Sequence, residues 1–126
     1  MDRSTFMRAA IDLADRNVAS GNGGPFGSVV VHEGKIIGSG ANFVTSTNDP
    51  TAHAEVVAIR DACKNLDRFS LEGCEIYASC EPSPMCLSAI YWARIERIYY
   101  GNTAADAADI GYDDADIYSE LALSMA

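Results

Sequence analysis

The chain has 126 residues, 48% of them hydrophobic and 21% charged, which fits one compact domain over residues 1–126 and excludes a disordered protein. Its net charge of −9 argues against a general affinity for nucleic acid, which needs a footprint of lysine and arginine. Because no run of about 18 apolar residues and no signal-peptide core are present, we expect a cytoplasmic protein with no membrane partner.

The first part of the chain predicts a helix followed by a β-hairpin. Residues 4–20 carry an apolar stripe at helical spacing, and the glycine-rich segment 21–25 ends it. Residues 27–32 and 35–40 predict two strands, which the turn signal Glu33-Gly34 joins. These two strands are therefore expected to pair antiparallel.

The rest of the chain alternates between helices and strands. A polar loop over residues 43–51 leads into a helix over residues 52–66. The later expected elements are a strand at 74–78, a helix at 84–93, a strand at 97–101, and helices at 103–110 and 113–123. This order predicts an α/β fold, a three-layer α-β-α sandwich whose mixed sheet is antiparallel in its first hairpin and parallel in its later strands.

Two short segments hold the residue types of a metal centre. Residues 50–55 read Pro-Thr-Ala-His-Ala-Glu, and residues 80–86 read Cys-Glu-Pro-Ser-Pro-Met-Cys. Each segment lies where a loop enters a helix, and the positive end of a helix stabilises a thiolate and lowers the pKa of a cysteine. Two such helix starts that face each other would supply one histidine and one or two cysteines to a zinc ion, with His53 and Glu55 flanking a metal-bound water.

The zinc deaminase signature is His-x-Glu followed by Pro-Cys-x-x-Cys. The first half is complete, since His53 and Glu55 are both present. In the second half the spacing is kept, but Ser83 stands at the first cysteine position and Cys86 at the second. A serine hydroxyl is neutral at pH 7 and is a poor zinc ligand beside a thiolate, so we expect a weakened affinity for zinc.

Four blocks of the sequence, in this order, resemble the bacterial guanine deaminases of the cytidine deaminase superfamily. They cover residues 23–27 (Gly-Gly-Pro-Phe-Gly), 45–55, 89–94 and 111–114. The resemblance extends over nearly the whole chain and implies the cytidine deaminase fold. It also implies hydrolysis of guanine to xanthine and ammonia by a zinc-activated water, a small-molecule purine substrate and a homodimer.

The resemblance further implies roles for individual residues. His53, Ser83 and Cys86 match zinc-ligand positions, and Glu55 matches the proton shuttle. The residues that match substrate-binding positions are Phe26, Asn42, Ala54, Trp92 and Asp114. Of these, Asn42 and Asp114 would hydrogen-bond the purine, whereas Phe26 and Trp92 would line the base pocket. Cys80 is expected to be structural and His32 to lie at the surface.

Several alternatives stay open at this point. Ser83 fits a deliberate Cys→Ser substitution that traps an inactive enzyme, a natural variant that binds metal weakly, or a lineage that has lost catalysis. The substrate fits guanine first, and another small base or nucleoside, guanosine or cytosine, second. A catalytically inactive, metal-poor protein of the same fold is the third reading. The sequence also ends before the family's C-terminal strand and tail, so we expect residues 97–101 to form an exposed edge.

Overall fold

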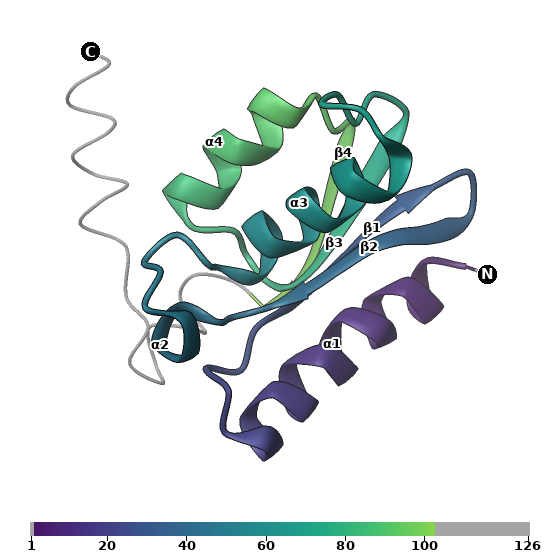
Figure 1. Ribbon diagram of the computed structural model, residues 1–126. Helices are drawn as coiled ribbons and strands as arrows, with labels where there is room; N and C mark the ends of the chain where they lie inside the picture. The colour runs from purple at the N-terminus through teal and green to yellow at the C-terminus, as the bar shows by residue number, and fades with distance from the viewer. Residues whose placement is uncertain (1, 103–126) are drawn as a thin grey trace, which may run out of the picture.

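The computed structural model describes residues 2–102, so the helices expected at 103–110 and 113–123 lie outside the described residues. The elements are α1 (Arg3–Ser20), β1 (Gly27–His32), β2 (Lys35–Ala41), α2 (Val44–Thr47), α3 (Ala54–Leu66), β3 (Cys74–Cys80), α4 (Pro84–Ala93) and β4 (Arg97–Asn102) (Figure 1). Within residues 2–102, none of the helices is long and apolar enough to cross a membrane.

The strands form one mixed sheet in the order β2-β1-β3-β4. β1 pairs antiparallel with both β2 and β3, whereas β3 and β4 pair parallel. The expected antiparallel hairpin and parallel later strands are therefore confirmed. Among the described residues, β4 stands at one edge of this sheet and β2 at the other.

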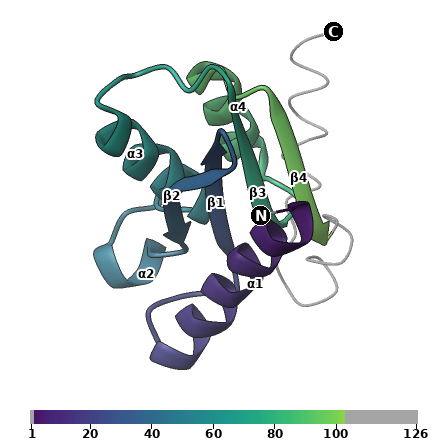
Figure 2. The same ribbon diagram turned by 90° about the vertical axis from the view of Figure 1, so that its right-hand side faces the viewer.

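Helices cover both faces of the sheet and make three layers. α1 lies on one face, and α3 and α4 lie together on the other, as the two views show (Figures 1 and 2). Val29 and Val31 pack with Phe6 of α1, while Val30 packs with Ala58 of α3. The consecutive valines of β1 are all buried because side chains alternate between two faces that are both covered.

α3 approaches β2 closely because two residues of the strand have no side chain. A Cβ added to Gly40 would lie 2.5 Å from the carbonyl oxygen of Ala54 and 2.6 Å from the amide nitrogen of Ala58. A Cβ on Gly38 would similarly lie 2.6 Å from the amide nitrogen of Ala62. A side chain at either glycine would push the helix away, so these glycines set the height of the start of α3 above the sheet.

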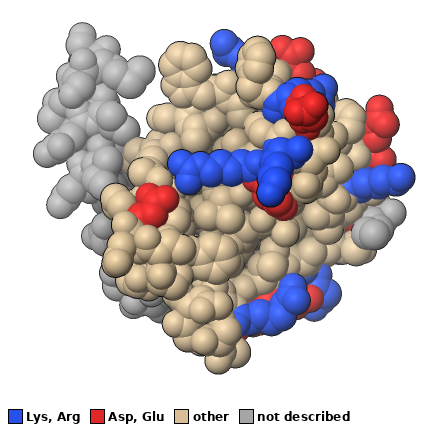
Figure 3. Space-filling model, in the orientation of Figure 1, with Lys and Arg blue, Asp and Glu red and all other residues tan. Residues whose placement is uncertain are grey.

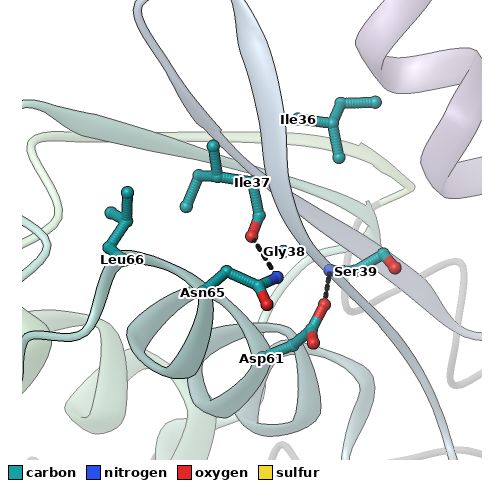
Figure 4. A pocket seen from close by; sticks show the side chains of 7 residues that line it. All are labelled: Ile36, Ile37, Gly38, Ser39, Asp61, Asn65 and Leu66. Carbon is teal, nitrogen blue, oxygen red and sulfur yellow. Dashed lines mark hydrogen bonds between the residues drawn. The ribbon is translucent and has the colours of Figure 1, made fainter.

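Two side chains of α3 also form hydrogen bonds with the backbone of the edge strand β2 (Figure 4). The Asp61 carboxylate accepts a hydrogen bond of 3.0 Å from the Ser39 amide, and the Asn65 amide donates one of 2.8 Å to the Ile37 carbonyl. A surface hollow opens beside them, lined by Ile36, Ile37, Gly38, Ser39, Asp61, Asn65 and Leu66. These bonds occupy edge groups that would otherwise be open to another strand, and they anchor α3 on the sheet.

The structure corrects the sequence-based boundaries around residue 50. The segment 43–51, expected to be a loop, contains the one-turn helix α2, in which the Phe43 carbonyl accepts from the amide and the hydroxyl of Thr47. The helix expected from residue 52 begins at Ala54, because the amide of Ala52 is bonded at 3.1 Å to the Asp49 carbonyl in a turn. His53 consequently becomes the N-cap of α3.

Candidate active site

The starts of α3 and α4 meet at the end of the sheet where β2 and β3 terminate (Figure 1). His53 Nδ1 lies 3.4 Å from Cys86 Sγ and 3.4 Å from Ser83 Oγ. The two segments that the sequence singled out, thirty and more residues apart, are thus brought into contact. The structure places a histidine, a thiol and a hydroxyl around one point.

The loop before α3 presents the His53 side chain to this point. The Asp49 carboxylate accepts from the Thr51 amide at 2.9 Å and from the Thr51 hydroxyl at 2.7 Å, which closes a tight turn. Arg60 of α3 lies 3.6 Å from the other oxygen of this carboxylate. His53 has an extended backbone and makes no side-chain capping bond with its own helix, so the imidazole faces the neighbouring helix start instead.

Ser83 has a structural function in α4 besides its place in the site. It is the N-cap of the helix, with Pro84 directly after it, and its hydroxyl accepts a hydrogen bond of 3.3 Å from the Cys86 amide. Serine is among the residues preferred at an N-cap because its oxygen satisfies an amide that the helix leaves unpaired. The hydroxyl therefore both faces His53 and caps α4.

This capping bond gives a measurable expectation for stability. Replacing Ser83 with alanine removes the acceptor of the Cys86 amide, and we expect the metal-free chain to lose about 1 kcal/mol of unfolding free energy. Urea unfolding followed by circular dichroism measures the loss. Ser88→Ala is the matched control, because Ser88 bonds the Pro84 carbonyl within the same helix and caps nothing. Equal losses in the two variants would contradict a capping function for Ser83.

Glu55 is the buried carboxyl of the site. Only 7% of the residue is exposed, and it is the acidic residue of the first turn of α3. Burial raises the pKa of this carboxyl, since the charged form is costly away from water, although a hydrogen bond with Cys86 partly opposes the rise. A carboxyl with a raised pKa holds a proton that it can release and recover, which suits a general acid and base.

Cys86 shows that burial outweighs the helix terminus in the metal-free site. The thiol is fully buried, and burial together with the charge of Glu55 raises its pKa, while a hydrogen bond with Ser83 lowers it. The pKa of this cysteine is therefore raised in the metal-free chain even though the residue lies at the start of α4. Desolvation is the larger effect because the thiolate would lie beside a carboxyl and without water.

The residues present do not fit a tightly bound zinc ion. Catalytic zinc is held by three protein ligands with nitrogen, sulfur or carboxylate donors. His53 and Cys86 are donors of this kind, but the third group in contact is the neutral hydroxyl of Ser83, which already accepts from an amide. Across residues 2–102, no group of three histidine, cysteine, aspartate or glutamate side chains is arranged to hold a metal.

The residues expected to bind substrate are only partly gathered here. Asn42 follows β2, Phe26 precedes β1, and both are partly buried. Ala54 is the first residue of α3 and is buried. Trp92, near the end of α4, is 79% exposed, so the described residues leave its ring in solvent. Asp114 lies outside the described residues, and the substrate-binding functions of all five stay predictions.

Two other residues lie as follows. His32 is at the end of β1 opposite to Gly27, and its side chain is 27% exposed with Nε2 at 3.8 Å from the Glu33 carboxylate. Cys80, the last residue of β3, is partly buried and forms no disulfide, and its structural function stays a prediction. None of the four cysteines, all within residues 2–102, forms a disulfide.

Sequence reasoning missed one residue that contacts this region, Asn17 of α1. Its side chain is buried and bonds the backbone of Asn42. The signal was available in the sequence, because Asn17 continues the helical spacing of the apolar residues Ala10 and Ala14. A polar residue inside an apolar stripe needs a hydrogen-bond partner and therefore marks a specific contact.

Residues 1–102 match the family described as the cytidine and deoxycytidylate deaminase zinc-binding region. The chain belongs to this deaminase family. Over 121 residues it is 54% identical to the guanine deaminase of Bacillus subtilis (strain 168). The aligned residues are 96% of this chain and 78% of that protein. The crystal structure of the Bacillus subtilis guanine deaminase superposes with a TM-score of 0.93, covering 94% of this chain and 76% of that one.

More distant deaminases match a shorter part of the chain. The tRNA-specific adenosine deaminase of Aquifex aeolicus (strain VF5) is 41% identical over 100 residues, which are 79% of this chain and 66% of that protein. The family assignment and the fold are thus confirmed, and the chain is an enzyme of the deaminase family. Its relatives thus include a guanine deaminase and a tRNA-specific adenosine deaminase.

Proposed function

We propose that this deaminase acts on guanine, giving xanthine and ammonia by hydrolysis, and that Ser83 weakens its metal centre. The observation that carries the proposal is the convergence of His53, Cys86 and Ser83 at the starts of α3 and α4, with the buried carboxyl of Glu55 bonded to the same thiol. The 54% identity to a guanine deaminase supports guanine as the base.

Glu55 is the proton shuttle in this proposal. Replacement of an amino group by water requires a proton to reach a ring nitrogen and then the departing amine, and one positioned carboxyl serves both transfers. Burial raises the pKa of this carboxyl, which favours its protonated form relative to an exposed glutamate. Because Glu55 is buried at the start of a helix that is bonded to the sheet edge, its position does not depend on a mobile surface side chain.

Asn42 is the residue proposed to orient the base. Its side-chain oxygen accepts a hydrogen bond of 3.1 Å from the Val44 amide, so the amide nitrogen is the group proposed to donate to the base. Purine ring nitrogens and the guanine carbonyl oxygen are acceptors that such a donor recognises. Phe26, Ala54, Trp92 and Asp114 complete the proposed binding set.

Zinc is the proposed cofactor, and its affinity is proposed to be low. His53 and Cys86 would hold the ion, and when bound it would supply an activated water. Ser83 contributes a neutral oxygen in place of a thiolate, so the chain lacks the third strong ligand. We therefore propose that the chain binds zinc weakly but keeps its recognition of the base.

The substrate assignment is tested on the Ser83→Cys variant, in which the ligand set is complete. Purified protein with added zinc is supplied in turn with guanine, guanosine and cytosine, and released ammonia is measured. Guanine is expected to give the highest kcat/KM. A zinc-loaded variant that prefers guanosine or cytosine would overturn the substrate assignment while leaving the family assignment in place.

Transfer RNA is expected not to be a substrate or a partner. A tRNA-binding surface needs several lysines and arginines that release counterions from phosphate, whereas this chain has a net charge of −9. Figure 3 shows one face, on which basic side chains alternate with acidic ones among uncharged residues. Filter binding of tRNA at increasing salt should detect no salt-dependent complex. Tight binding at low salt that weakens with salt would contradict this expectation.

A second candidate function is a metal-poor protein that binds a purine without catalysis. The hydrogen bond from the Cys86 amide to Ser83 favours it, since the serine stabilises the metal-free helix start. Calorimetric titration with guanine separates the two candidates. Guanine binding by a zinc-free chain with no turnover after zinc is added supports the second, and turnover supports the first.

A further inference from the structure

Asn17 is a buried polar residue on a helix that carries no part of the proposed chemistry. It is 5% exposed, on the face of α1 whose other buried residues are Phe6, Ala10 and Ala14. α1 covers the face of the sheet opposite to α3 and α4 (Figure 2). A buried amide is costly unless it is hydrogen-bonded, so its partners explain its presence.

The Asn17 amide nitrogen donates two hydrogen bonds, and both acceptors lie in loops that carry proposed substrate-binding residues. Nδ2 donates to the carbonyl of Gly24 at 3.0 Å and to the carbonyl of Asn42 at 2.8 Å. Gly24 lies in the loop that leads to Phe26 and β1, and Asn42 directly follows β2. One side chain therefore ties together two loops that are far apart in the sequence.

The contact between these loops leaves no spare room. A Cβ built on Gly23 would overlap the carbonyl oxygen of Asn42 and would lie 3.1 Å from Asn17 Nδ2. Glycine at this position allows the loop to reach both groups. The carbonyl of Asn42 is consequently in contact with both the Asn17 amide and Gly23.

Asn42 is held at its side chain as well. The Val44 amide donates to its Oδ1 at 3.1 Å. The amide of Phe43, the residue directly after Asn42, donates to the Ala52 carbonyl at 2.9 Å. The second bond links this segment to the turn that presents His53. These two bonds connect the Asn42 side chain to the backbone of residues 43–44 and that backbone to Ala52, the residue before His53.

We propose that Asn17 is a positioning residue for substrate binding, which fixes Asn42 and the Gly24–Phe26 loop without touching the base. The inference rests on the proposed function, in which Asn42 orients the purine. Removing the amide takes away the Asn17 donor from the carbonyl of Asn42 and leaves the Gly24 carbonyl with only the bond from the Phe26 amide, so the two loops are no longer tied together. The expected consequence is weaker binding of the base with unchanged chemistry at Glu55.

The geometric part is tested on the chain as it stands, without substrate. In 15N-labelled Asn17→Ala, the side-chain amide signals of Asn42 and the backbone amide of Phe26 are expected to shift or broaden. Asn22→Ala, which removes an exposed amide from the turn that follows α1, is the matched control and should leave both signals in place. Unchanged Asn42 and Phe26 signals in a folded Asn17→Ala chain would overturn the proposal.

The functional part is tested in the Ser83→Cys background with zinc. Asn17→Ala is expected to raise KM for guanine about tenfold, the equivalent of losing one buried hydrogen bond, while kcat and zinc content stay unchanged. A merely structural function would instead lower the amount of active enzyme, and therefore kcat, at constant KM. A fall in kcat with KM unchanged would overturn the proposal.

A second variant reaches the same contact from the other side. Gly23→Ala keeps the Asn17 amide but pushes against the Asn42 carbonyl, so it should reproduce the rise in KM and the shift of the Asn42 signals. It also decides the matter if Asn17→Ala does not fold. If the zinc-loaded Ser83→Cys parent does not deaminate guanine, the proposed function fails, and the signals of Asn42 still decide the positioning by themselves.

Discussion

Ser83→Cys is expected to convert a chain that binds zinc weakly into one that binds a full equivalent, with guanine turnover rising roughly a hundredfold or more. The new thiolate would lie at the start of α4, where Ser83 Oγ is now 3.4 Å from His53 Nδ1. With Cys86 and His53 it completes three ligands of the kind that catalytic zinc uses. A cation between the two sulfurs also favours the thiolate of Cys86, which burial disfavours in the metal-free chain.

Metal analysis of the purified protein and ammonia release from guanine, measured together, check this expectation. Ser88→Cys is the matched control, because it adds a cysteine to the same helix at a residue that bonds the Pro84 carbonyl instead of facing His53. Only the variant at position 83 should gain zinc. Full zinc and turnover in the unsubstituted chain would show that the serine does not impair the centre.

The spacing of motifs predicted the fold and the site's main contacts well. His53 and Cys86 are far apart in the sequence, but each was expected at a helix start. β2 and β3 both run antiparallel to β1, so they finish at the same end of the sheet, and the helices that follow them start there. The alternation of helices and strands likewise predicted a three-layer sandwich, and helices do cover both faces of the sheet. Regular periodicity was sufficient in both cases.

Contacts between loops were not predictable in this way. The start of α3 at Ala54 depends on the turn that Asp49 closes with Thr51, and sequence periodicity does not weigh such side-chain bonds. The raised pKa of Cys86 depends on how deeply α4 is buried, which a helix start by itself does not indicate. Asn17 bonds the backbone of two loops outside its own helix, so only the three-dimensional structure reveals its two acceptors.

Glu55→Gln in the Ser83→Cys background is expected to lower kcat for guanine by about two to four orders of magnitude, because an amide cannot carry the proton between water, ring nitrogen and leaving amine. The substitution keeps the size of the side chain and removes a charge that burial disfavours. Zinc content and the unfolding midpoint of the metal-free protein should therefore not fall, and the loss belongs to catalysis alone.

Steady-state kinetics, metal analysis and thermal unfolding on the same preparation separate these effects. Glu96→Gln, at an exposed position beside β4, is the matched control and should retain the parent's kcat. A Glu55→Gln enzyme that keeps its zinc and turns over guanine within about tenfold of the parent would exclude Glu55 as the shuttle. The proton would then have to move through another group, and since Glu55 is the buried carboxyl among the described residues, that group would have to exchange it with solvent.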